Sequence, residues 1–149
     1  MQICSELKEF NRIYKEFDDI YHDIASNLHL SDSIFTILYS IFCLGDGCLQ
    51  RDICAISFIS KQTVNSAVQK MIRADHLYLT PGKGKDKHLH LTASGKKLLQ
   101  ETIPPVIQIE NHVFEQLTPE ESAQLLHLTK KYVSLLRKES KLFIERNFT

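Results

Sequence analysis

The sequence of 149 residues has no tryptophan, 5 glycines and 4 prolines, and its net charge is zero. So little glycine and proline excludes a collagen-like repeat and low-complexity disorder. The most apolar stretch, 34–44, covers 11 residues, whereas a membrane span needs about 20. The first ten residues contain three charges and no apolar segment, which argues against a secretory signal peptide. We therefore expect a cytoplasmic protein with no membrane partner.

Residue patterns typical of catalytic or metal sites are also scarce. The seven histidines include no i, i+4 pair beside a carboxylate, and no nucleophile–base pair or cofactor motif is found. We expect no metal site, no cofactor and no enzymatic activity. The cysteines match no common zinc-binding spacing, and we interpret most of them as reduced, buried, apolar side chains, with oxidant sensing as the alternative. They are Cys4, Cys43, Cys48 and Cys54.

Charge is unevenly distributed along the chain. Residues 49–100 contain nine lysines and arginines but three acids, a net charge of +6, so the remaining residues carry −6. A basic middle between acidic ends indicates a surface that binds a polyanion such as DNA. The alternative is a surface on which the charges are merely scattered unevenly.

Residues 3–28 predict a long helix with an apolar stripe in a heptad pattern. The stripe comprises Ile3, Leu7, Phe10, Tyr14, Phe17, Tyr21, Ile24 and Leu28. It packs either on a second subunit or within its own domain, and the sequence leaves both open. Ser31 and Asp32 then begin a second helix that is apolar almost all round as far as Leu44, so we expect this helix at the centre of the core.

Two helices joined by a short break follow at 50–56 and 60–74. The outward face of the second contains amides, hydroxyls and cations but no acid, a composition suited to base edges and phosphates. That face comprises Lys61, Gln62, Thr63, Asn65, Ser66, Gln69, Lys70 and Arg73. A period of two at 77–79 and 89–91 then predicts a β-hairpin. Its glycine-containing tip carries three basic residues, Lys83, Lys85 and Lys87.

Two further helices complete the predicted fold. Thr92 begins the first, which Pro104 and Pro105 should kink or interrupt. Thr118 and Glu121 form a capping box for the second. We expect this last helix to run to about Lys141 and to bury one face. That face comprises Leu125, Leu128, Tyr132, Leu135 and Leu136.

A short helix, a turn, a polar-faced helix and a basic hairpin together predict a winged helix-turn-helix. The expected fold class is therefore mainly α, with one small hairpin as the wing and long helices on both sides. The segments 60–67 (SKQTVNSA) and 91–96 (LTASGK), in this order and spacing, resemble the multiple-antibiotic-resistance regulator (MarR) family of transcription factors. The departures are Lys83 and Lys85, where the family has Asp and Arg, His76, where it often has Gly, and Leu49, where it has Ser or Thr.

The resemblance implies a single domain over 1–149, with a DNA-binding lobe at 31–100 and a dimerisation region at 1–28 and 101–149. It implies a homodimer that binds a pseudo-palindromic operator in double-stranded DNA and represses nearby genes. The alternative is a winged helix that binds proteins instead of DNA. The residues expected to contact DNA are Ser60, Lys61, Gln62, Thr63, Asn65, Ser66, Lys70, Lys83, Lys85 and Lys87.

The resemblance also implies a ligand cavity between the dimerisation helices and the DNA-binding lobe. Its expected lining is aromatic and contains no cation, so the expected small-molecule effector is hydrophobic or aromatic rather than strongly anionic. The alternative is that these aromatic side chains only pack the core. They are Tyr14, Phe17, Tyr21, Phe35 and Tyr39.

Overall fold

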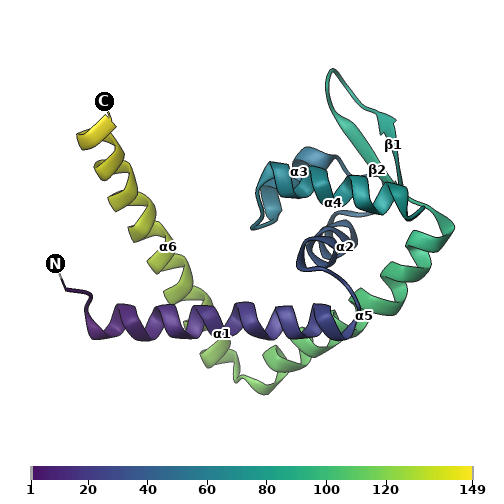
Figure 1. The fold of residues 1–149 in the computed structure, drawn as a ribbon. Coiled ribbons are helices and arrows are strands. Elements are labelled where there is room, and N and C mark those ends of the chain that lie inside the picture. The colour runs from purple at the N-terminus through teal and green to yellow at the C-terminus, as the bar shows by residue number, and fades with distance from the viewer. Residues whose placement is uncertain (1, 149) are drawn as a thin grey trace. The chain divides into compact units, whose positions relative to one another are not determined.

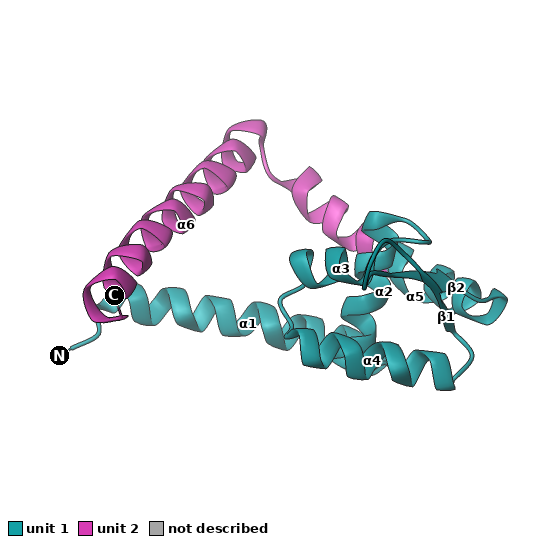
Figure 2. Ribbon diagram, turned by 90° about the horizontal axis from the view of Figure 1, so that it is seen from above, with its two compact units in different colours: residues 1–105 teal, residues 106–149 magenta. Residues whose placement is uncertain are grey.

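The computed structural model describes residues 2–148, which form six helices and one two-stranded sheet (Figure 1). The predicted fold class, mainly α with a single hairpin, is confirmed. Two compact units, 1–105 and 106–149, divide within the fifth helix (Figure 2). The elements are α1 (Ser5–Asn27), α2 (Asp32–Leu44), α3 (Gln50–Ile56), α4 (Lys61–Arg73), β1 (Leu77–Pro81), β2 (Lys87–Leu91), α5 (Ala93–Gln116) and α6 (Pro119–Phe148).

The core of the first unit is built around α2, as the sequence predicts. The side chain of Ser31 caps α2 by accepting a hydrogen bond from the Ile34 amide at 3.4 Å, and Gly45 ends the helix at a φ of +94°. α2 packs against α3 and α4, because it is apolar on several sides and each neighbour offers one apolar face. The fully buried side chains include Ile37, Leu38, Ile41, Ile53, Val64, Val68, Met71, Leu77 and Leu89.

The hairpin pairs in the predicted alternating register, from Leu77 opposite Leu91 to Pro81 opposite Lys87. Leu77, Leu89 and Leu91 point into the core, whereas the neighbouring Tyr78 is exposed and His90 is half-buried. The turn before α3 lies along the free edge of β2. Gly47 N–H donates to the Leu89 carbonyl at 2.8 Å, and Leu89 N–H donates to the Cys48 carbonyl at 2.9 Å. The wing is therefore fixed at its base to the turn before α3.

The start of α5 is held close to the end of α4. Thr92 Oγ1 accepts a hydrogen bond from the Gly95 amide at 3.0 Å and donates to the Asp75 carbonyl at 2.6 Å. A Cβ atom on Gly95 would lie 1.9 Å from the His76 carbonyl oxygen, closer than any two such atoms can approach. Gly95 therefore allows the 91–96 segment to pack directly on the backbone that joins α4 to β1.

Of the two predicted effects of the proline pair, the interruption is wrong and the kink stays a prediction. α5 runs without a break from Ala93 to Gln116 and contains both Pro104 and Pro105. Each proline removes one amide from the helical hydrogen bonds. The carbonyls that lose an amide belong to Gln100 and Glu101, which are exposed. Water can therefore satisfy these carbonyls and the helix continues.

The last helix also differs from its prediction. α6 extends to Phe148, beyond the expected end near Lys141, and buries none of its described residues within this chain. Its predicted apolar face is 39% to 55% exposed, so the expectation that this face is buried is wrong for a single chain. A face of this kind can be covered by a second protein surface. Among residues 2–148, no single helix combines the length and the apolar composition of a membrane span.

Candidate nucleic-acid interface

The helix α4 separates an apolar face from a polar one. Ser60 caps it by accepting a hydrogen bond from the Thr63 amide at 3.1 Å, and its first turn contains no acid. Val64, Ala67 and Val68 are buried on one face. The polar side chains of the other face are all exposed, as the sequence predicts: Lys61, Gln62, Thr63, Asn65, Ser66, Gln69, Lys70 and Arg73. An accessible face of this composition can bind phosphates and base edges.

Gln50 is part of this surface, although the sequence did not point to it. It begins α3, and its side-chain amide donates a hydrogen bond to Asn65 Oδ1. This contact directs the side-chain oxygen of Asn65 toward α3. Gln50 and Asn65 are 15 residues apart in separate helices, so no spacing rule links them. The only available signal was an amide at the first position of the helix before α4.

The tip of the wing exposes three lysines. Gly82 N–H donates to the Asp86 carbonyl at 2.9 Å, and Gly84 has a φ of +65°, so a tight turn projects the tip away from the lobe. Among the residues that the structure describes, none of the lysines forms an ion pair. They are Lys83, Lys85 and Lys87. An exposed basic tip of this kind suits the phosphates of a nucleic-acid backbone.

The single acid of the tip faces the lobe. Asp86 Oδ2 lies 2.8 Å from Arg51 Nη1, and the Asp86 side chain is 22% exposed. Because Arg51 belongs to α3, this ion pair connects the tip to the helix-turn-helix. It also offsets the one negative charge that would oppose a polyanion at the wing.

A second carboxylate fixes the base of the wing. Asp46 accepts a hydrogen bond from the Leu91 amide at 2.8 Å and lies 3.2 Å from Lys96 Nζ. Burial raises the pKa of this carboxyl, but the hydrogen bond from Leu91 and the nearby Lys96 ammonium more than offset it, so the pKa lies below its usual value. The charged form of Asp46 therefore stabilises the junction of the turn before α3, β2 and α5.

The five aromatics expected to line a ligand cavity are only partly brought together. The Tyr21 and Phe35 rings lie 6.3 Å apart and the Phe35 and Tyr39 rings 6.2 Å apart, which forms a three-ring cluster between α1 and α2. Phe35 is buried, whereas Tyr14 and Phe17 are 56% and 58% exposed on α1. The ligand cavity therefore stays a prediction. Of its five expected lining residues, the single chain brings together Tyr21, Phe35 and Tyr39.

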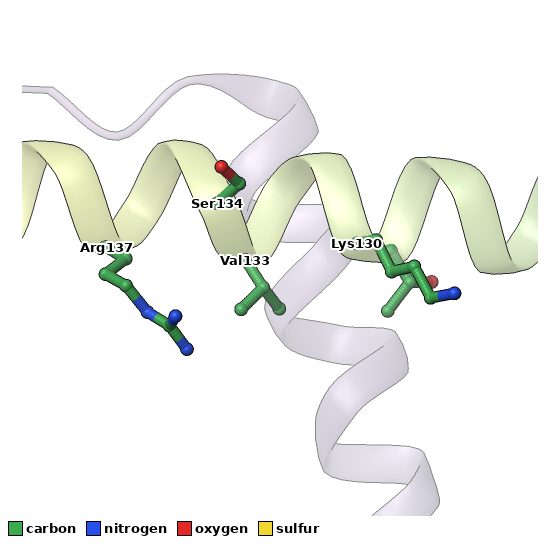
Figure 3. A pocket seen from close by; sticks show the side chains of 5 residues that line it. Lys130, Val133, Ser134 and Arg137 are labelled. Atoms are coloured by element: carbon green, nitrogen blue, oxygen red, sulfur yellow. The ribbon is translucent and has the colours of Figure 1, made fainter.

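A separate depression lies on α6 (Figure 3). Lys130, Val133 and Arg137 lie along one side of this helix, and Thr129 and Ser134 complete the lining. All five residues come from one helix, so the depression lacks the opposing walls that enclose a small molecule. It does not correspond to the expected cavity.

The cysteines do not occupy the buried positions that we expected for most of them. Cys4 and Cys43 are exposed, and Cys48 and Cys54 are half-buried. Cys4 precedes α1 and Cys43 is in the last turn of α2, whereas Cys48 lies in the turn before α3 and Cys54 within α3. Burial raises the pKa of the Cys48 thiol above its usual value, which disfavours the reactive thiolate at this residue.

Comparison with solved structures reveals the same arrangement in a group of bacterial regulators. NMB1585, a MarR family regulator from Neisseria meningitidis, has a TM-score of 0.80 at 16% identity, covering 93% of this chain and 98% of that one. The chain has the fold of the MarR family. No protein-family model and no curated protein matches the sequence, so the MarR likeness is one of structure.

Two further structures with the MarR fold are relevant to the site. The Staphylococcus aureus MepR–DNA complex has a TM-score of 0.68 at 22% identity, covering 91% of this chain and 99% of MepR. Bordetella bronchiseptica BpsR, whose DNA binding is regulated by 6-hydroxynicotinic acid, has a TM-score of 0.63 at 22% identity. The match covers 84% of this chain and 91% of BpsR.

Proposed function

We propose that this protein is a sequence-specific DNA-binding transcriptional regulator that acts as a homodimer. The observation that carries the proposal is the acid-free polar face of α4 next to a wing whose one acid, Asp86, is paired with Arg51. The solved MepR–DNA complex, which has the same fold, supports DNA as the polyanion.

Each part of the surface has a distinct role in this proposal. α4 enters the major groove with its N-terminal end, as recognition helices do. Gln62 and Asn65 contact base edges there, and Lys61 contacts guanine or phosphate. The wing lysines contact the adjacent backbone, where they add affinity without base preference. Ser60, Thr63, Ser66 and Lys70 supply further contacts to phosphates and to the edges of bases.

Dimerisation sets the form of the operator. α1, the end of α5 and α6 each offer exposed apolar side chains to a second copy, among them Phe17, Val113 and Leu135. A two-fold dimer presents two α4 helices, so its operator is pseudo-palindromic with half-sites about one helical turn apart. A regulator bound over a promoter can block transcription, and we propose that this protein acts in this way, as a repressor.

The effector proposal rests on the cluster of Tyr21, Phe35 and Tyr39. A hydrophobic or aromatic molecule that binds this region better in the DNA-free conformation would release the operator. The regulation of BpsR by 6-hydroxynicotinic acid supports a small aromatic effector. That molecule carries a carboxylate, whereas the three rings here include no cation, so we propose an uncharged aromatic effector for this protein. A coupling of about 1–3 kcal/mol corresponds to an affinity change of about 5- to 150-fold. Titration of the DNA complex with phenolic compounds, for the native protein and for Tyr39→Ala, tests it.

The DNA-binding proposal is tested with a random-sequence duplex at low salt, followed by a salt titration. We expect binding that weakens steeply as salt rises, because phosphate contacts release counterions. The triple variant Lys61→Ala, Gln62→Ala and Asn65→Ala should lose sequence preference, whereas Lys138→Ala on α6 should behave as the native protein. A native protein that binds no duplex at low salt would instead favour a protein-binding winged helix.

A further inference from the structure

Phe58 is the most exposed large apolar side chain among the described residues, at 98%. It lies in the turn between α3 and α4, at the centre of the segment 57–59. Its two neighbours, Ser57 and Ile59, are both half-buried. The turn therefore directs these two side chains inward and leaves the Phe58 ring outside the core.

The position of Phe58 separates it from the exposed apolar residues of the terminal helices. It stands two residues before Ser60, which caps α4, and three before Lys61, which begins the polar face. The basic and amide side chains that follow can contact phosphates and base edges. Unlike them, the exposed Phe58 ring carries no charge and forms no conventional hydrogen bond, so it is suited to contact an apolar group.

The major groove contains one apolar group that distinguishes the base pairs, the 5-methyl group of thymine. Because a recognition helix enters the groove with its N-terminal end, the residues just before α4 lie at the edge of the bases that α4 contacts. We propose that Phe58 contacts a thymine 5-methyl group at the outer edge of each half-site and so determines base preference there. This inference rests on the proposed DNA-binding function.

The contact is tested with a duplex selected from a random pool by the native protein. Each thymine of the duplex is replaced singly by deoxyuridine, which lacks only the methyl group. We expect one position in each half-site where the replacement weakens binding of the native protein by about fourfold, the effect of one buried methyl-sized group. Phe58→Ala should weaken binding to the unmodified duplex by a similar factor and abolish the sensitivity to deoxyuridine at that position.

Phe58→Leu serves as the matched control, because it keeps an apolar side chain at the same place. It should retain part of the deoxyuridine effect. Thermal unfolding of both variants should follow that of the native protein, since the ring is outside the core.

Several outcomes would overturn the proposal. Phe58→Ala with native affinity and native deoxyuridine sensitivity would show that Phe58 does not contact DNA. Equal weakening of all sequences, with the deoxyuridine sensitivity unchanged, would assign Phe58 to the sugar–phosphate backbone. If the native protein selects no sequence, the proposed function itself fails. That result is distinct from one in which the native protein selects a sequence and Phe58→Ala binds it with native affinity, which overturns the Phe58 proposal alone.

Discussion

The winged lobe and the terminal helices differ in how far a single chain covers their apolar side chains. In the lobe, Ile37, Val64 and Leu89 are completely buried. In contrast, α1 buries Ala25 alone and α6 buries none of its described residues. The two regions have similar apolar periodicity in sequence, so periodicity by itself does not show which partner covers a face. The lobe buries its apolar faces within one chain, whereas α1 and α6 leave theirs exposed, and the proposed dimer would cover them.

The largest expected effect tests the close packing within the lobe. Gly95→Ala places a Cβ atom 1.9 Å from the His76 carbonyl oxygen, so the backbone must move. We expect a loss of about 1–3 kcal/mol in the free energy of unfolding, the usual cost of overpacking, measured by urea denaturation.

Gly84→Ala at the wing tip is the control for Gly95→Ala. A Cβ atom there meets nothing within 4 Å, and the cost comes from its φ of +65° alone. We expect a loss of about 1 kcal/mol and no change in the packing of α5. Equal stability of Gly95→Ala and the native protein would mean that α5 does not pack on the His76 backbone.

The second effect tests whether the exposed apolar face of α6 binds a second copy of the chain. Leu135→Glu introduces a charge into the exposed apolar face of α6, where Leu135 is 53% exposed. Because a charge buried without a partner at an interface opposes association, we expect sedimentation as a monomer, with the lobe still folded. Ser134→Glu, one residue away and outside the leucine face, should remain dimeric. A native protein that sediments as a monomer at micromolar concentration would contradict the account of this surface.

A third effect tests whether the polar face acts as a unit. Asn65→Ala and Gln50→Ala should each relax base preference, because Gln50 donates to Asn65 Oδ1 and orients its amide. We expect about 5- to 150-fold loss of discrimination for Asn65→Ala, the range of one good base contact. The double variant should lose little more than Asn65→Ala, as measured in a double-mutant cycle. Additive losses would show that the two amides act independently.

The smallest effect concerns the base of the wing and pH. The folded-state pKa of Asp46 is depressed, so its contribution to stability is present above the unfolded-state pKa and is lost as pH falls through the folded-state value. Asp46→Asn keeps an acceptor for the Leu91 amide but loses the charge that pairs with Lys96. Its stability should therefore change less between pH 7 and pH 3 than that of the native protein, as measured by thermal unfolding. An identical loss of stability in both proteins would show that the charge of Asp46 does not contribute to the pH dependence.

The lobe follows the sequence closely because its signals are local. Ser60 caps α4 where the side-chain pattern predicts it, Gly45 ends α2, and the alternating leucines set the hairpin register. The contact between Gln50 and Asn65 could not be predicted, since it depends on the angle between two helices. The fate of Pro104 and Pro105 also depends on context, because the carbonyls they leave unpaired are open to water. The apolar faces of α1 and α6 could be recognised, but periodicity does not specify what covers them.

The central claim is that α4 in a dimer reads a two-fold operator. Selection of bound duplexes from a random pool tests it most directly, with the native protein and the triple variant Lys61→Ala, Gln62→Ala and Asn65→Ala run in parallel. We predict that the native protein enriches a pseudo-palindrome with half-sites about 10 base pairs apart between their centres, and that the variant enriches no such sequence. Enrichment of the same sequence by both proteins, or of none by the native protein, would contradict the account.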